Sequence, residues 1–162
     1  MNVRIAVLGL IVLAGVVAAG LFSMQAARQP AGIALQPGNA ALVERGALVY
    51  RTHCAACHGA QRQGQPNWRE RDAGGLLPAP PHDAEGHTWH HPDEVLFRLT
   101  KYGIAKEARL PDYRTAMPVY DGVLRDEDIV AVLSWIKAQW PAEIRERQDR
   151  INAEHLKSRA AS

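Results

Sequence analysis

The chain has little cysteine, almost no charge imbalance and no repeated sequence. Cys54 and Cys57 are its only thiols, which excludes a disulfide-stapled scaffold and a metal cage built entirely from cysteine. From Pro37 onward 17 basic residues face 17 acidic ones, so no basic footprint for nucleic acid is present. No alternating strand pattern is visible. With 47% hydrophobic and 22% charged residues, the composition is typical of one globular domain and argues against extended disorder.

The first 24 residues are expected to form a membrane anchor or an export signal. Ile5 to Phe22 is a run of 18 uncharged residues, about 27 Å long as a helix at roughly 1.5 Å per residue, which nearly spans a bilayer. The competing interpretation is a cleaved secretory signal, which Arg4 and the small residues 18–20 fit. On either interpretation the following residues are exported.

We divide the remaining chain into a linker at 25–38, a folded domain at 39–140 and a charged tail at 141–162. The linker is small, polar and interrupted by proline and glycine. The tail alternates charges with few apolar residues, as in a solvated helix or a frayed end.

Helical periodicity predicts three helices in the folded domain, over residues 39–50, 92–102 and 126–140. Two irregular segments separate them, at 59–89 and from Gly103 to Gly122. The fold class is therefore all-α. Gly46 lies on the apolar face of the first helix, where glycine costs about 1 kcal/mol against alanine. It is either tolerated there or marks a close approach by another backbone or a large ring.

One motif carries specific chemistry, the pentapeptide Cys54-Ala55-Ala56-Cys57-His58. Two thiols separated by two residues can add to the two vinyl groups of a haem, and the adjacent histidine can then ligate the iron. A thioredoxin-like redox pair would need a surrounding βαβ pattern, which is missing. A zinc site would need two further ligands, which the histidines can supply, but no second cysteine pair is present. The motif predicts one covalent haem c.

Met117 is the predicted sixth ligand of the iron, by elimination. The other methionines, Met1 and Met24, belong to the export segment and its flank. Pro118 biases Met117 away from helix and toward an extended conformation, from which a loop can present a thioether. A core methionine is the alternative. Four histidines compete as ligands or as part of a second metal site: His82, His87, His90 and His91.

This order of elements resembles the class I c-type cytochromes, specifically the single-haem bacterial members. The resemblance rests on a helix, Cys54-Ala55-Ala56-Cys57-His58-Gly59, a long loop, a helix, Ala116-Met117-Pro118 and a terminal helix that begins with acidic residues. It implies that the first and last helices of the domain cross beside the haem, with Gly46 and Tyr50 meeting the last helix around Leu133 and Ile136.

The resemblance also implies a hydrogen bond from the His58 ring to a carbonyl near Leu77 or Pro78, with Pro80 and Pro81 as competitors. The chain departs from the family at Arg125, where serine or threonine commonly caps the last helix.

These observations predict an electron carrier rather than an enzyme, with His58 and Met117 as axial ligands. Expected partners are redox proteins such as an oxidase, reductase or dehydrogenase. The expected location is the periplasmic side of a bacterial inner membrane, or the soluble periplasm if the leader is cleaved. Two alternatives stay open: a haem enzyme or small-ligand sensor with a labile sixth ligand, and a cytochrome subunit of a larger oxidoreductase.

Overall fold

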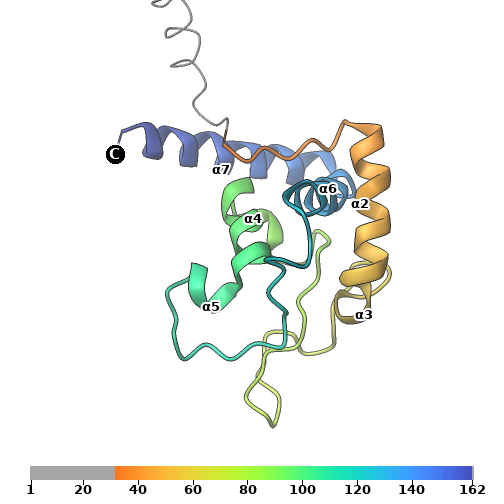
Figure 1. Cartoon of the computed structure of the whole chain (residues 1–162), viewed down its shortest axis with the longest axis vertical. Coiled ribbons are helices and arrows are strands. Elements are labelled where there is room, and N and C mark those ends of the chain that lie inside the picture. The colour runs from red at the N-terminus through yellow and green to blue at the C-terminus, as the bar shows by residue number, and fades with distance from the viewer. Residues whose placement is uncertain (1–31, 162) are drawn as a thin grey trace, which may run out of the picture. The chain divides into compact units, whose positions relative to one another are not determined.

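A computed structural model describes residues 32–161, and all regular structure in that part of the chain is helical (Figure 1). The long helices are α2 (Ala40–His53), α4 (Asp93–Tyr102), α6 (Asp126–Ala138) and α7 (Ala142–Ala160). The short helical segments are α3 (Ala55–His58), the 3₁₀ turn η1 (Thr88–His90) and α5 (Ile104–Glu107). The three predicted helices of the domain are confirmed. The short helix α5 was not predicted, since four residues are too few for a periodic pattern.

The expected membrane anchor or signal at 1–24 lies outside the described residues, as does the first half of the expected linker, residues 25–31. Among the helices that the structure describes, none is long and apolar enough to cross a membrane.

Helices α2 and α6 cross in close contact and form the centre of the fold (Figure 1). The Asn39 side chain starts α2 by accepting a hydrogen bond from the Leu42 amide, 3.2 Å away. At the crossing, a Cβ atom added to Gly46 would collide with the Ala131 backbone and lie 2.7 Å from the Trp135 Cβ. Gly46 therefore marks the close approach of another backbone.

The resemblance placed Gly46 and Tyr50 against the last helix around Leu133 and Ile136, and the crossing lies in that region of α6. Gly46 contacts Ala131 and Trp135, and the centroid of the Tyr50 ring lies 4.6 Å from that of Trp135. Leu133 and Ile136 are buried in the core.

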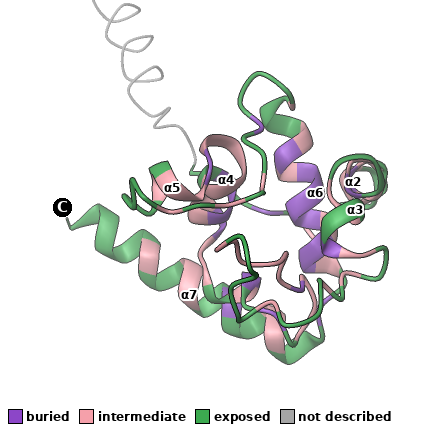
Figure 2. Ribbon diagram, turned by 90° about the horizontal axis from the view of Figure 1, so that it is seen from below, coloured by how far each residue is buried: buried purple, intermediate pink, exposed green. Residues whose placement is uncertain are grey.

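The hydrophobic core gathers around α6, much of whose length is coloured as buried in Figure 2. The buried apolar residues come from α2, α4, α6 and the segments next to them: Leu35, Tyr50, Leu96, Phe97, Tyr120, Ile129, Ala131, Val132, Leu133, Ile136 and Trp140. Such burial contributes roughly 1.5–3 kcal/mol for each large side chain. It holds α2, α4 and α6 together around the loops that carry the site.

The α6 helix begins without a side-chain cap, as Arg125 at that position predicts. Three acidic residues in the first turn, at 126–128, face the positive end of the helix dipole instead. Burial raises the pKa of Asp128, but hydrogen bonds from Arg45 and Arg125 outweigh it and leave the pKa lowered. The Arg45 bond also joins α2 to the start of α6.

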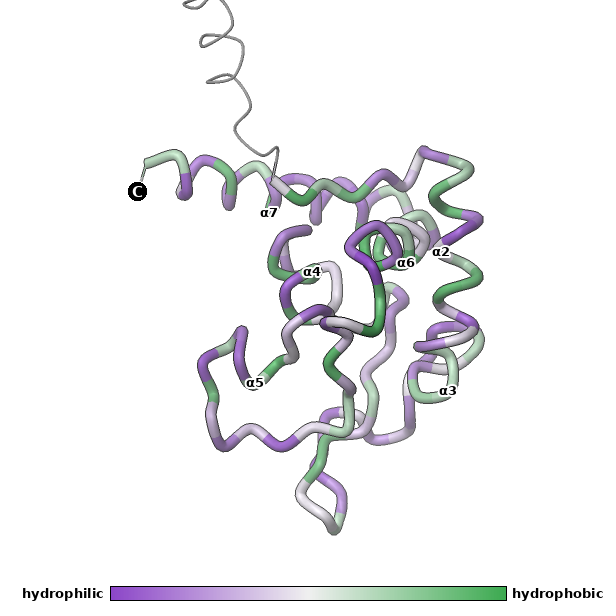
Figure 3. Tube along the Cα trace, viewed as in Figure 1, coloured by the Kyte–Doolittle hydropathy of each residue, from purple (hydrophilic) through white to green (hydrophobic). Residues whose placement is uncertain are grey.

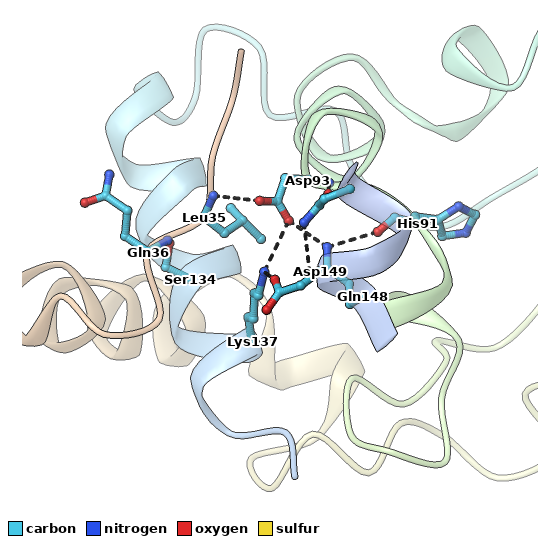
Figure 4. Close-up of polar contacts among 9 residues, drawn as sticks. Leu35, Gln36, His91, Asp93, Ser134, Lys137, Gln148 and Asp149 are labelled. Carbon is cyan, nitrogen blue, oxygen red and sulfur yellow. Dashed lines mark hydrogen bonds and ion pairs between the residues drawn. The ribbon is translucent and has the colours of Figure 1, made fainter. Parts of the chain in front are cut away.

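The charged tail forms the 19-residue helix α7, which packs against the rest of the domain. Gln148 is completely buried and donates hydrogen bonds to the Asp93 carboxylate at 2.6 Å and the His91 carbonyl at 3.2 Å (Figure 4). Figure 3 shows mixed hydropathy along α7 with no apolar stripe. Because polar side chains make these contacts, the hydropathy pattern of α7 did not predict that the helix packs against the domain.

The same polar cluster holds residues 33–38, which the sequence had placed in the linker. The Leu35 amide donates to Asp93 at 2.9 Å, and the Gln36 amide donates to the Ser134 hydroxyl at 2.9 Å (Figure 4). The Leu35 side chain is buried in the core. This stretch therefore lies against the helices before α2 begins.

Candidate functional site

The Cys54–His58 pentapeptide lies at the junction of two helices. Cys54 ends α2 and starts α3, the single turn that ends on His58. The amides of Cys57 and His58 donate to the Cys54 carbonyl at 3.2 and 2.9 Å. Both cysteines are free thiols; Cys54 is half-buried and Cys57 is exposed. One helical turn thus presents two thiols and one imidazole to the same region.

The Cys54 thiol is not activated for redox exchange. Burial, with a smaller contribution from Cys57, raises its pKa from 9.0 to about 11. Reactive Cys-x-x-Cys pairs instead have a lowered pKa, because the thiolate is the attacking species. The raised pKa of Cys54 therefore argues against a thioredoxin-like pair.

His58 is buried, and its ring is oriented by the loop that follows. Its Nδ1 lies 2.8 Å from the Pro80 carbonyl oxygen. A carbonyl only accepts, so Nδ1 carries the proton and donates it. Burial lowers the pKa of His58 despite this bond, which keeps the ring neutral. The Nε2 lone pair is then available to a metal.

The orienting carbonyl belongs to Pro80, one of the two competitors named from the sequence, and not to Leu77 or Pro78. The reason lies in the path of the loop. Gly64, with φ +69°, packs against the Pro80–Pro81 peptide, and its amide donates to the His58 carbonyl at 2.8 Å. This contact brings Pro80, rather than an earlier residue, over the His58 ring.

His82 stacks on His58, with ring centroids 3.9 Å apart and planes at 24°. Its Nδ1 pairs with the Thr88 hydroxyl at 2.8 Å, and its backbone carbonyl accepts from the Trp140 indole at 2.8 Å. Face-to-face rings do not point their nitrogens at opposite sides of one metal. In this arrangement His82 is a packing neighbour of His58, not a ligand opposite to it.

Met117 lies in an irregular stretch at 113–120, as Pro118 predicts. Its side chain is half-buried against the hydrophobic core, and its amide donates to the Thr115 hydroxyl at 3.0 Å. This segment is tied directly to the motif. The buried Tyr120, three residues after Met117, donates its hydroxyl to the carbonyl of His53 at 2.7 Å. His53 immediately precedes Cys54.

Tyr50 and Tyr120, whose roles the sequence did not reveal, fix the two ends of the pentapeptide. The Tyr50 hydroxyl donates to the carbonyl of Gly59, just after His58, at 2.9 Å. The Tyr120 bond holds the other end, just before Cys54. Burial is the main cause that raises the pKa of both phenols, so both remain protonated donors at neutral pH. Their local sequence carries no signal of this role, because each bonds to a backbone atom.

A cleft of about 420 Å³ separates the loop after α3 from the Met117 segment. Leu76, Leu77 and Pro78 line one side, and Ala116, next to Met117, lines the other. Both segments lie on the side of the helices away from α7 (Figure 1). Neither the Cys54–His58 pentapeptide nor Met117 itself is among the residues that line this cleft.

Comparison with known protein families decides what this arrangement is. The family model for cytochrome c matches residues 43–140. The chain belongs to the cytochrome c family. Comparisons with curated proteins and with solved structures found no match. As a cytochrome c, the protein has covalent haem c as its cofactor, and the spacing of Cys54 and Cys57 fits the attachment motif.

The residues of this cytochrome fit its cofactor. Cys54 and Cys57 are free thiols that can bond to the ring, and the neutral His58 has an Nε2 lone pair that can bind the iron. The match also includes α6 and ends at Trp140, the last residue before Pro141. Helix α7 lies outside it. The docked C-terminal helix is therefore an addition to the matched domain in this chain.

Proposed function

We propose that this cytochrome is a one-electron carrier in which His58 and Met117 fill both axial positions of the haem iron. Haem-based electron transfer is the activity typical of the family. The observation that supports the ligand pair is the hydrogen bond from Tyr120 to the His53 carbonyl. This bond ties the Met117 segment to the residue before Cys54. Met117 is only three residues from Tyr120, and three extended residues span about 10 Å, so Met117 stays close to the motif.

The protein's own residues supply binding, orientation and shielding. Cys54 and Cys57 retain the ring covalently, while the Pro80 carbonyl holds the His58 imidazole in one tautomer and one orientation. The bound haem supplies a single electron step between ferric and ferrous iron. A thioether at the second axial position favours the ferrous state and raises the potential. With both positions filled, neither oxygen nor a substrate reaches the metal without displacing a ligand.

We further propose that the protein works on the outer face of a bacterial inner membrane, or in the periplasm if its leader is removed. Covalent haem attachment together with the apolar run at 5–22 supports an exported protein. Residues 39–140 contain 12 basic and 13 acidic side chains. A nearly neutral domain suits transient docking to redox partners through a small interface, without strong electrostatic steering.

The purified full-length protein tests the proposal by mass and by spectrum. The mass should exceed that of the polypeptide by one haem, and the N-terminus distinguishes an anchor from a cleaved signal. The ferric protein should show the long-wavelength sulfur-to-iron band, and the ferrous protein should not respond to carbon monoxide. Carbon monoxide binding by the unmodified protein would instead establish the alternative of a ligand sensor or enzyme. Co-purification in mild detergent distinguishes a free carrier from a subunit of a larger oxidoreductase.

A further inference from the structure

His87 and His91 flank the 3₁₀ turn η1, and their rings lie with one nitrogen of each facing the other. The Nε2 atoms of His87 and His91 are 3.2 Å apart. The ring contacts of the pair are with each other, with Trp68 and with His90, not with the residues assigned above to the haem. Figure 4 shows the His91 ring pointing away from the polar cluster that docks α7.

This separation is the one that a shared metal ion requires. Imidazole nitrogens bind Zn²⁺ at about 2.0–2.1 Å. Two such nitrogens lie roughly 2.9 Å apart when they subtend a right angle at the metal and roughly 3.3 Å apart at a tetrahedral angle. The observed 3.2 Å falls between these values. One ion can thus be reached by both rings with little movement.

The backbone that carries the pair is held on both sides. The His90 amide donates to the His87 carbonyl at 3.0 Å, which closes the turn η1. The Thr88 hydroxyl pairs with His82, and the His91 carbonyl accepts from the buried Gln148 of α7. Because these contacts are already made, binding an ion requires little ordering of the chain.

The charge state of the pair also suits a cation. Burial is the main cause that lowers the pKa of both His87 and His91, so both rings are neutral at pH 7. Arg69 lies near enough to His87 to contribute to this shift, and its positive charge limits the affinity. His90 stacks on Trp89 with ring centroids 3.7 Å apart. The centroid of the His90 ring lies 6.2 Å from that of His87, farther than the 5.1 Å between His87 and His91.

We propose that His87 and His91 form a two-histidine site for a divalent transition cation of the zinc, copper and nickel class. Imidazole ligands favour these ions over Mg²⁺ and Ca²⁺, which prefer oxygen. Within residues 32–161 no set of three or more His, Cys, Asp or Glu side chains converges on one metal position. The protein therefore supplies two ligands, and water or a group from a partner completes the coordination.

A calorimetric titration of the full-length haem-loaded protein with Zn²⁺, in mild detergent at pH 7.5, tests the site. We expect one equivalent of Zn²⁺ to bind, and Mg²⁺ to give no heat. Removal of an outer-sphere partner alone typically weakens metal binding by about 10- to 100-fold. His87→Gln and His91→Gln should therefore each weaken Zn²⁺ binding by about 10-fold or more. The neighbouring variant His90→Gln is the matched control and should bind like the unmodified protein.

Absorbance of the haem, recorded for each variant, checks folding independently of zinc. The proposal is wrong if the unmodified protein binds no Zn²⁺ at millimolar concentration, since the two rings then share only an N–H···N hydrogen bond. It is equally wrong if His87→Gln and His91→Gln bind as tightly as the unmodified protein, or if His90→Gln loses as much affinity as they do. None of these outcomes depends on which residue is the sixth haem ligand.

Discussion

The phenolic oxygen of Tyr120 lies 2.7 Å from the backbone carbonyl oxygen of His53. This bond joins segments that are 67 positions apart in the chain, one leading into Cys54 and the other following Met117. Tyr50 makes the corresponding bond at the opposite end of the motif, to Gly59. Both phenols therefore hold the pentapeptide by a hydrogen bond, but only Tyr120 connects it to the segment of the proposed sixth ligand.

Replacing Tyr120 by phenylalanine should loosen the Met117 segment. One lost hydrogen bond costs about 0.5–1.5 kcal/mol in the free energy of unfolding. We also expect a weaker sulfur-to-iron band in the ferric spectrum of Tyr120→Phe. Tyr50→Phe is the matched control, since it should lose similar stability while the band keeps its intensity. Equal loss of the band in both variants would count against a specific link between Tyr120 and Met117.

Met117→Ala should leave the haem covalently attached but open one axial position. The ferrous variant is then expected to bind carbon monoxide, and its midpoint potential should fall because the thioether no longer favours ferrous iron. Absorption spectra with and without carbon monoxide measure the first effect, and redox titration measures the second. Met24→Ala serves as the control methionine. If Met117→Ala keeps the parent spectrum and excludes carbon monoxide, Met117 is not the ligand.

Gly46→Ala tests the crossing of α2 and α6. Alanine favours a helix over glycine by about 1 kcal/mol, so the local effect alone would stabilise the protein. The added methyl group meets the Ala131 backbone and the Trp135 Cβ, and such overpacking costs about 1–3 kcal/mol. Net destabilisation in urea unfolding is expected. Gly38→Ala, where no atom lies within 4 Å of the added carbon, should be nearly neutral. A stabilised Gly46→Ala protein would refute the close approach.

Gly64→Ala should disturb the carbonyl that orients His58. The added Cβ would lie 2.5 Å from the Pro81 nitrogen and 2.7 Å from the Pro80 carbonyl carbon. A weaker bond from Nδ1 to that carbonyl makes the imidazole less basic, so the midpoint potential should rise.

The matched control for Gly64→Ala is Gly122→Ala. Both glycines have positive φ, +69° and +75°, and both substitutions incur the left-handed penalty of about 1–2 kcal/mol. Gly122 has no atom within 4 Å of an added Cβ. Redox titration should therefore separate the variants, with Gly122→Ala keeping the parent potential. The same potential in both variants would mean that the Pro80 contact has no influence on the iron.

Gln148→Ala should weaken the docking of α7. The buried amide donates to the Asp93 carboxylate, and hydrogen bonds to charged groups contribute about 1.5–3 kcal/mol. Urea unfolding followed by circular dichroism should show a loss of about that size. Gln139→Ala, at the exposed C-terminus of α6, is the control and should change stability by less than about 0.5 kcal/mol. A loss in Gln148→Ala no larger than that in Gln139→Ala would show that Gln148 does not contribute to the docking of α7.

Much of the fold and the haem-binding motif could be predicted from the sequence, because their signals are local. Apolar residues at helical spacing predicted α2, α4 and α6, and Pro118 predicted the irregular segment around Met117. The docking of helix α7 could not be predicted in this way. Its docking depends on Gln148 and on the ion pair between Lys137 and Asp149 at 2.6 Å, and polar residues of this kind also occur on solvated helices.

The sequence alone determined that this chain attaches a haem, because two thiols and a histidine need only one helical turn to act together. It also limited the methionine of the folded part to one residue, Met117. Tertiary structure decided which carbonyl orients His58, which tyrosines hold the pentapeptide and that His87 faces His91. Those contacts depend on the path of an irregular loop between distant helices, and hydrogen bonds to backbone atoms do not specify a residue type.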